Sequence, residues 1–140
     1  MAIDSLFNIA SSALNAQLTR MNTTASNLAN AGTTANSEAG AYKAKRVNFE
    51  AIVQQAQAAG ANFEGGVRIG DIVEDRTPVP SMFDPGHPNA DANGYVYGTN
   101  VNEVAEMVDM MAAARSYQNN VEVVNTAKQL MLRTLEITKA

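Results

Sequence analysis

The chain has 140 residues, of which 10 are basic, 14 acidic and one His, with no Cys and no Trp. That length fits one domain, and a formal net charge of −4 gives no reason to expect nucleic acid as a partner. Without cysteine there is no disulfide, thiolate nucleophile or Cys-ligated zinc site. No carboxylate pair, Ser-His-Asp set or phosphate-binding loop stands in a suitable context, so we expect neither an enzyme nor a cofactor.

Insertion into a membrane is not expected either. The longest run of consecutive apolar residues is five, at 110–114, whereas a spanning helix needs about twenty. The first residues also lack a basic start followed by an apolar stretch, so no Sec-type signal is predicted.

Residues 3–31 have the periodicity of a long helix with one narrow apolar seam. The seam positions are Phe7, Leu14, Leu18, Met21, Ala25 and Leu28. Asp4 or Ser5 is suited to cap the start, and no Gly or Pro interrupts the pattern before Gly32.

This first segment is almost uncharged, with only Asp4 and Arg20 among its 29 residues and 13 Ser, Thr, Asn or Gln. A neutral face loses water far more cheaply than a charged one. We therefore expect the helix to be buried against other protein in an assembly. The compatible alternative is a helix of poor helix formers that is partly disordered in the free monomer.

Residues 102–138 predict a second long helix, with a seam that alternates steps of three and four. Its positions are Met107, Met110, Ala114, Tyr117, Val121, Val124, Lys128, Met131 and Leu135. Lys128 can lay its stem along the seam while its ammonium reaches water. Asn100 followed by Glu103 resembles a capping box. The methionines are either plain seam packing or an adaptable surface for unlike neighbours.

The segment between the helices, 32–100, holds all nine glycines and all four prolines. Short strands are expected at 67–73 and 95–97, and a short helix at 49–59, ended by Gly60. The prolines exclude regular helix across 78–88. Two readings of the basic cluster Lys43, Lys45 and Arg46 stay open: contact with an acidic patch on another subunit, or a strand edge protected from unwanted pairing.

These elements predict a mainly α fold in which the terminal helices pair as an antiparallel coiled-coil hairpin around an extended, partly β excursion. The expected divisions are 1–32, 33–100 and 101–140, which together form one structural unit. A two-helix hairpin buries only a seam, so we expect the pair to need neighbours.

Two metal sites can be drawn in the excursion, and we expect neither. Asp84, His87 and Asp91 have no second His or Cys beside them, so His87 is read as a turn residue whose imidazole meets a carboxylate or a backbone carbonyl. Residues 89–94 resemble the start of a calcium loop, but the twelfth place is Asn100 rather than a bidentate Glu.

Long motifs in both helices resemble the axial proteins of the bacterial flagellum, the rod and hook family. They are SALNAQLTRMNTTASNLANAGTT at 12–34 and VNEVAEMVDMMAAARSYQNNVEVVNTAKQLMLRTLEI at 101–137. The runs AYKAKRVNFEAI at 41–52 and FDPGHPNADANGYVYGTNVN at 83–102 narrow the resemblance to a proximal rod subunit. The signature positions are Asn27, Leu28, Ala29, Asn30, Asp84, Pro85, His87, Pro88, Asp91, Gly94, Tyr95, Asn100, Val101 and Asn102.

The resemblance implies a structural subunit that leaves the cytoplasm through the flagellar type III export apparatus without a cleaved signal. It would polymerise into the periplasmic rod of the basal body, transmit torque and surround the export channel. The implied partners are other copies, other rod proteins, the rod-to-ring adaptor and the distal rod. The competing hypothesis is a small helical adaptor or secretion chaperone, for which so long a Gly- and Pro-containing excursion would have little use.

Overall fold

The computed structural model describes residues 2–53 and 65–139, with side chains placed for 5–52 and 65–137. The elements are α1 (Ala2–Asn30), β1 (Lys45–Val53), β2 (Gly65–Glu74), β3 (Ser81–Phe83), β4 (Tyr95–Tyr97) and α2 (Glu103–Lys139). Two long helices flank a strand-containing segment, which confirms the mainly α class. The strands expected at 67–73 and 95–97 are also confirmed, as β2 and β4. Within these described residues, neither helix has an apolar stretch long enough to cross a bilayer.

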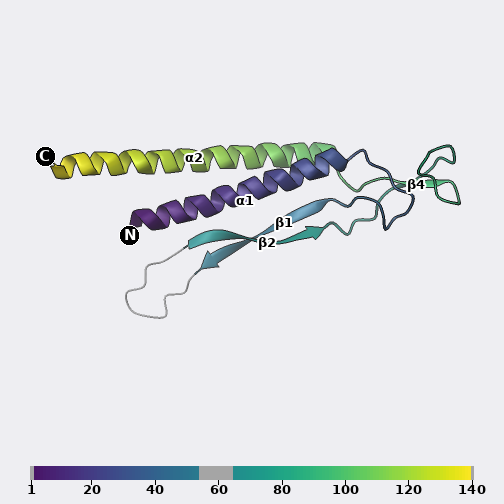
Figure 1. The fold of residues 1–140 in the computed structure, drawn as a ribbon, viewed down its shortest axis with the longest axis horizontal. Helices are drawn as coiled ribbons and strands as arrows, with labels where there is room; N and C mark the ends of the chain where they lie inside the picture. The colour runs from purple at the N-terminus through teal and green to yellow at the C-terminus, as the bar shows by residue number, and fades with distance from the viewer. Residues whose placement is uncertain (1, 54–64, 140) are drawn as a thin grey trace.

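Helix α1 is the middle layer of an elongated molecule. It packs against α2 on one side and against β1 and β2 on the other. Figure 1 shows the two helices running in opposite directions, with both chain ends at the left and the β3–β4 pair at the far right. The ribbon β1–β2 is tied to α1 where the Ser12 hydroxyl accepts a hydrogen bond from the Val67 N–H at 3.1 Å. Because protein covers α1 on two sides, much of its neutral surface is already desolvated within one chain.

The ribbon β1–β2 is antiparallel and carries one bulge. Val47 pairs with Ile72 and Phe49 pairs with Ile69, so two residues of β2 face one residue of β1. The helix expected at 49–59 is therefore wrong as far as Val53, because these residues are the end of β1. Phe49, Ile52 and Val53 favour strand structure, and β2 supplies the pairing partners that this preference needs. The rest of that expectation, 54–59 with Gly60, lies outside the described residues.

The expected caps of both helices are corrected by the structure. Helix α1 begins at Ala2, so Asp4 and Ser5 lie inside its first turn. At the start of α2 the cap is Asn102, whose Oδ1 accepts the Ala105 N–H at 3.0 Å. Asn100, the expected cap, is not available for that role because its side chain binds the backbone of the central segment instead.

The described part of the chain has almost no core of large side chains. Its buried apolar residues are five alanines and two valines: Ala10, Ala16, Ala41, Ala44, Val79, Val96 and Ala113. Large apolar side chains lie exposed along both helices and both strand pairs. Alanines let the helices approach closely, but they bury little apolar area, and hydrophobic stabilisation scales with that area. The fold of one chain therefore depends unusually strongly on its polar contacts.

Candidate assembly interface

Asn27 is the residue that joins the three segments of the chain. Its Oδ1 accepts the Lys45 N–H at 2.9 Å, while its Nδ2 donates to the Lys45 carbonyl at 2.9 Å. The same amide donates to Glu106 at 3.0 Å and accepts from the Tyr42 hydroxyl at 3.1 Å. A fully buried amide has thus used both N–H groups and both lone pairs.

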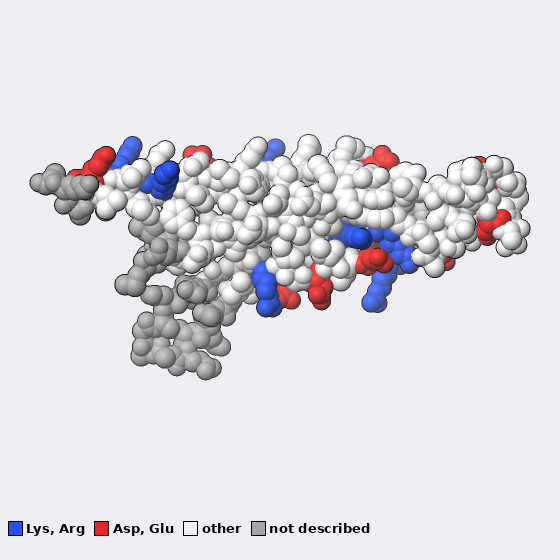
Figure 2. Space-filling view, in the orientation of Figure 1, with Lys and Arg blue, Asp and Glu red and all other residues white. Residues whose placement is uncertain are grey.

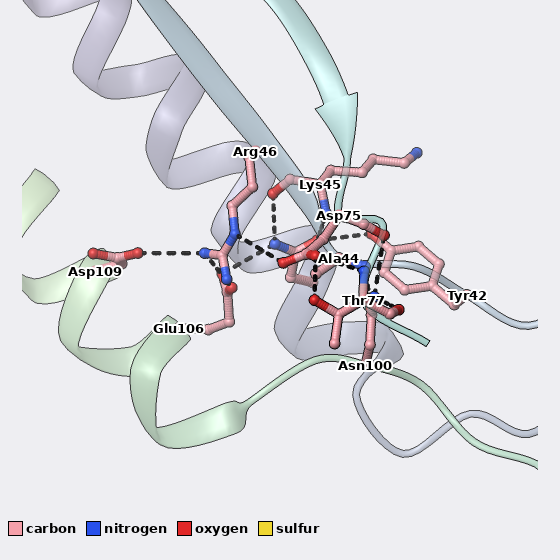
Figure 3. A network of polar contacts seen from close by, with 10 residues as sticks. Tyr42, Ala44, Lys45, Arg46, Asp75, Thr77, Asn100, Glu106 and Asp109 are labelled. Carbon is pink, nitrogen blue, oxygen red and sulfur yellow. Dashed lines mark hydrogen bonds and ion pairs between the residues drawn. The ribbon is translucent and has the colours of Figure 1, made fainter. Parts of the chain in front are cut away.

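Glu106 contributes the charge at this junction. It is 1% exposed, and its Oε1 lies 2.9 Å from Arg46 Nη1. The other carboxylate oxygen accepts the amide of Asn27. A buried carboxylate is tolerated only when it is paired and hydrogen-bonded, and strand β1 and helix α1 each supply one partner. We call Asn27, Tyr42, Lys45, Arg46 and Glu106 the polar node (Figure 3).

A second ion pair lies one helical turn further along α2. Arg20 Nη2 is 2.9 Å from Asp109 Oδ1, and Arg46 Nη1 is 3.6 Å from the other oxygen of Asp109. These side chains border a polar pocket of about 320 Å³ between α1, β1 and α2. Unlike Glu106, Asp109 is 39% exposed, so water screens this pair.

Asn100 fastens the central segment to the start of α2. Its Oδ1 accepts the Ala44 N–H at 2.7 Å, and its Nδ2 donates to the carbonyl of Thr77 at 2.8 Å. Next to it, the carboxylate of Asp75 accepts the hydroxyl and the backbone N–H of Thr77. Those two hydrogen bonds, and to a lesser extent the charge of Arg46, hold the pKa of the Asp75 carboxyl below its usual value.

The strands β3 and β4, with the turn between them, form the far end of the molecule, which we call the tip (residues 81–98). Asp91 Oδ1 accepts the N–H groups of Asn93 and Tyr95, both at 2.8 Å. His87 lies in a turn as expected, but its Nδ1 accepts the Asn89 N–H at 3.0 Å rather than meeting a carboxylate or carbonyl. Over the residues that the structure describes, no three acidic or His side chains gather as a metal site.

The signature positions fall into three places. Asn27, Leu28, Ala29 and Asn30 form the last turn of α1; Asp84, Pro85, His87, Pro88, Asp91, Gly94 and Tyr95 belong to the tip; and Asn100, Val101 and Asn102 lead into α2. Thr99, just after the tip, is joined to the end of α1, because its hydroxyl donates to the Ala31 carbonyl at 2.9 Å. Residues far apart in the sequence thus share one junction.

The seam residues take two kinds of position. Phe7, Leu14, Met21 and Leu28 on α1, and Met110, Ala114, Tyr117, Val124 and Met131 on α2, are half-buried; Leu18, Ala25, Met107, Val121, Lys128 and Leu135 are exposed. On α2 the more buried line passes through Glu106 and Ala113, one residue before Met107 and Ala114. Both lines satisfy the same alternation of steps, so only packing distinguishes them.

The three basic residues of the cluster at 43–46 have separate surroundings. Arg46 finds acidic partners inside the chain, at Glu106 and Asp109. Lys45 is exposed, and its Nζ lies 5.7 Å from the centre of the Tyr42 ring. Lys43 is half-buried and borders a separate hollow with Asp75 and Arg76.

One face of α1 is exposed along its length and carries no charge. The exposed positions are Asn8, Ser11, Asn15, Leu18, Asn22, Ala25 and Ala29. They recur in steps of three and four, so they lie on one side of the helix. We call these seven residues the neutral stripe. A solvated helix face normally carries Lys and Glu, so this composition is typical of a surface that meets other protein.

The sequence reading did not single out Tyr42 or Glu106. Glu106 has no local mark of burial, because its burial depends on partners from α1 and β1. One feature of the sequence points toward the polar node: Asn27 lies in a nearly uncharged helix that is expected to be covered. A polar side chain in a covered helix needs hydrogen-bond partners.

Comparison with known protein sequences shows the family of this chain. Residues 7–35 match the family model described as "Flagella basal body rod protein", and residues 92–137 match "Flagellar basal body rod FlgEFG protein C-terminal". The chain is 47% identical over 137 residues to the flagellar basal-body rod protein FlgC of Salmonella typhimurium, with 98% of each chain covered. FlgC of Yersinia enterocolitica is 46% identical with the same coverage. FlgC of Bacillus subtilis is 37% identical, covering 94% of this chain and 95% of the relative. At such identity over nearly the whole length, with helices, strands and tip all inside the match, the chain belongs to the FlgC family of flagellar basal-body rod proteins.

Proposed function

We propose that this chain is a structural subunit of the proximal rod of the flagellar basal body. Its membership of a basal-body rod family makes it a structural component of the rod. The observation that carries the finer proposal is the neutral stripe, since an exposed, uncharged helix face is suited to burial against neighbouring subunits. The subunit would reach the periplasm through the flagellar type III export apparatus.

The paired helices would form the inner wall of a helical tube around the export channel and carry torque along the rod. Support comes from the opposite directions of α1 and α2 (Figure 1) and from the half-buried Met110, Tyr117, Val124 and Met131 on the facing line. In this proposal the two helices pack as a coiled coil, and the polar node makes the three segments one structural unit. Large residues left exposed on α2, such as Met111 and Leu132, would be covered by adjacent subunits.

The partners in this proposal are further copies of the chain, the other proximal rod proteins, the rod-to-ring adaptor and the distal rod. A helical tube that does not close needs heterologous contacts, in which two different faces of the subunit meet. The neutral stripe on α1 and the exposed side of α2 that carries Met111 and Leu132 are two such unlike faces. Lys43 and Lys45 remain available for an acidic neighbour, whereas Arg46 is already paired within the chain.

The first test is mass spectrometry of basal bodies purified through a stripping wash. We expect the chain to stay with the rod in several copies. Its absence there, with abundant chain in the cytoplasm, would favour the helical adaptor or secretion chaperone instead.

A substitution in the neutral stripe tests whether this face of α1 is buried against neighbouring subunits in the rod. Ala25→Glu places a charge on the stripe, while Asn48→Glu places the same charge on an exposed position of β1. Both should leave the free energy of unfolding of the monomer within about 0.5 kcal/mol of wild type, because both sites are exposed. We expect Ala25→Glu, and not Asn48→Glu, to lose incorporation into basal bodies and reduce swimming. Wild-type incorporation of Ala25→Glu would remove the neutral stripe from the assembly interface.

A further inference from the structure

Helix α2 is buried along a line of residues that is hardly apolar. Glu106 is 1% exposed and Ala113 0%, and Asn120, seven residues further on, is half-buried. Residues seven positions apart lie on nearly the same side of a helix, so these three form one line, which we call the inner line. Because the line consists of a carboxylate, a methyl group and an amide, its burial gives little hydrophobic stabilisation.

A more apolar line lies next to it. Met107, Ala114 and Val121 each follow a residue of the inner line by one position, and we call them the flanking line. Met107 is 49% exposed and Val121 37%, whereas Ala114 is half-buried. One residue corresponds to about 100° around the helix axis, so a rotation of α2 by that amount would bury the flanking line instead. Burial of Met and Val would remove more apolar surface from water.

The contacts of Glu106 explain why the inner line is nevertheless the buried one. Its carboxylate accepts the Asn27 amide at 3.0 Å and pairs with Arg46 at 2.9 Å. Asn27 is in turn held by the backbone of Lys45 through two hydrogen bonds of 2.9 Å. These partners come from α1 and β1, so the carboxylate reaches them only when Glu106 points between those two elements (Figure 3).

The second ion pair gives this orientation weaker support. Arg20 Nη2 lies 2.9 Å from Asp109 Oδ1, but the two side chains are 32% and 39% exposed. Water screens their charges, and partly exposed side chains can move together when a helix turns. The contacts of Glu106 therefore provide most of the preference for the orientation in which the inner line is buried.

We propose that the polar node fixes the rotation of α2 about its own axis, by selecting one of two orientations in which α2 can pack on α1. The node selects the inner line against the hydrophobic preference for the flanking line. Buried polar residues can fix the register of paired helices in the same way. This selection is a property of the single chain, so its test does not depend on the proposed function.

The selected orientation also decides which residues of α2 stay uncovered. Val104, Val108 and Met111 are 68%, 56% and 66% exposed in it. Figure 2 shows the surface along α2, at the top of the molecule, as largely white with separate charged side chains. A contact in the interior of the chain thus determines the composition of its outer surface.

Thiol labelling of the full-length chain measures the orientation. The chain has no Cys, so one introduced Cys is its only thiol. Ala113→Cys reports on the inner line and Val121→Cys on the flanking line, and a free Cys behaves as a small apolar residue at either place. The rate of alkylation by iodoacetamide is followed by mass spectrometry, and circular dichroism measures the helix content of each variant.

Two substitutions break the contact between Asn27 and Glu106 and have different expected results. Asn27→Leu keeps the carboxylate but removes its amide partner, so α2 should turn: labelling at 121 becomes roughly tenfold slower and labelling at 113 faster. Glu106→Leu makes the inner line apolar, so α2 should keep its orientation and labelling at 121 should be no slower than in wild type. Asn22→Leu, on the neutral stripe, is the matched control and should leave both rates unchanged.

Labelling at 121 is the deciding measurement, because transient unfolding can only speed the reaction. The expected result is slower labelling there in Asn27→Leu but not in Glu106→Leu. If the rate at 121 does not fall in Asn27→Leu, the proposal is overturned, because the inner line then stays buried without its partner or the helices separate instead of turning. Slower labelling at 121 in Glu106→Leu overturns it as well, because loss of the charge should favour the inner line.

Discussion

The amide nitrogen of Asn27 and the carboxylate of Glu106 lie 3.0 Å apart, and both side chains are buried almost completely. One belongs to the last turns of α1 and the other to the first turn of α2. Because the apolar residues buried with them are only alanines and valines, this contact and its neighbours carry an unusual share of the specificity between the helices. A buried polar network of this kind is stable only when every member is satisfied.

Replacement of Asn27 by Ala is expected to destabilise the full-length chain by about 2–4 kcal/mol, because it leaves both backbone groups of Lys45 and one oxygen of Glu106 without their partner. Urea unfolding followed by circular dichroism measures the change. Asn22→Ala, on the neutral stripe, is the matched control and should stay within about 0.5 kcal/mol of wild type. Equal unfolding midpoints for the two variants would show that the polar node contributes no stability.

The two ion pairs near the start of α2 should differ in energy because they differ in burial. Glu106→Ala leaves one buried N–H of Asn27 without its acceptor and removes the buried end of the ion pair with Arg46, so it should cost about 2–4 kcal/mol. Asp109→Ala removes a carboxylate that is 39% exposed and should cost less than about 1 kcal/mol. Double-mutant cycles for Arg46–Glu106 and Arg20–Asp109 measure the two coupling energies. A larger coupling for Arg20–Asp109 would contradict this ranking.

Gly94 is expected to be required at the tip. Gly94→Ala places a Cβ on a residue with φ +80° and within 2.9 Å of the Phe83 ring, which should cost about 1–3 kcal/mol and displace the ring. Thermal unfolding and the NMR ring resonances of Phe83 and Tyr95 report the two effects. Gly32→Ala is the control, since its Cβ would have nothing within 4 Å. Unchanged ring resonances in Gly94→Ala would show that the tip accommodates the side chain.

The stability of the chain should depend on Asp75 at acid pH. The hydrogen bonds from Thr77, and secondarily the charge of Arg46, hold the pKa of the Asp75 carboxyl below its usual value of about 3.8 in the folded state. A depressed pKa means that the stabilisation is complete above the unfolded pKa and is lost as the pH falls through the folded pKa. Between pH 5 and pH 2, roughly the span across these pKa values, the free energy of unfolding of Asp75→Asn should therefore fall less steeply than that of wild type.

Thr77→Val provides the matched control for this pH dependence, because it removes the hydroxyl donor and keeps the backbone N–H and the side-chain shape. Its acid slope should lie between those of wild type and Asp75→Asn. NMR titration of the Asp75 carboxyl should show its pKa rising in Thr77→Val. Identical slopes for all three proteins would mean that the Asp75–Thr77 contacts do not change the stability.

The sequence by itself determined both helices, the strands at 67–73 and 95–97, and the rod family. Each is a local or repeated signal: a period of three and four over some thirty residues, alternation between turn residues, or long motifs at both ends. A long helical pattern leaves few alternatives, because one face must be covered along its whole length. The near absence of charge from residues 3–31 also predicts a covered helix, and within the chain α2 and the β1–β2 ribbon pack against it.

The tertiary structure alone decided which line of residues on α2 is buried and that residues 49–53 are part of a strand instead of a helix. The lines through Glu106 and through Met107 obey the same spacing, and hydrophobicity favours Met107; the amide of Asn27 and the guanidinium of Arg46 make burial of the Glu106 carboxylate possible. Residues 49–53, expected in a helix, are strand because β2 pairs with each of them. The cap of α2 is Asn102 instead of Asn100 because of another long-range contact: the Asn100 side chain accepts a backbone N–H that is 56 residues away in the sequence. Partners that only the folded chain brings together cannot be deduced from local spacing.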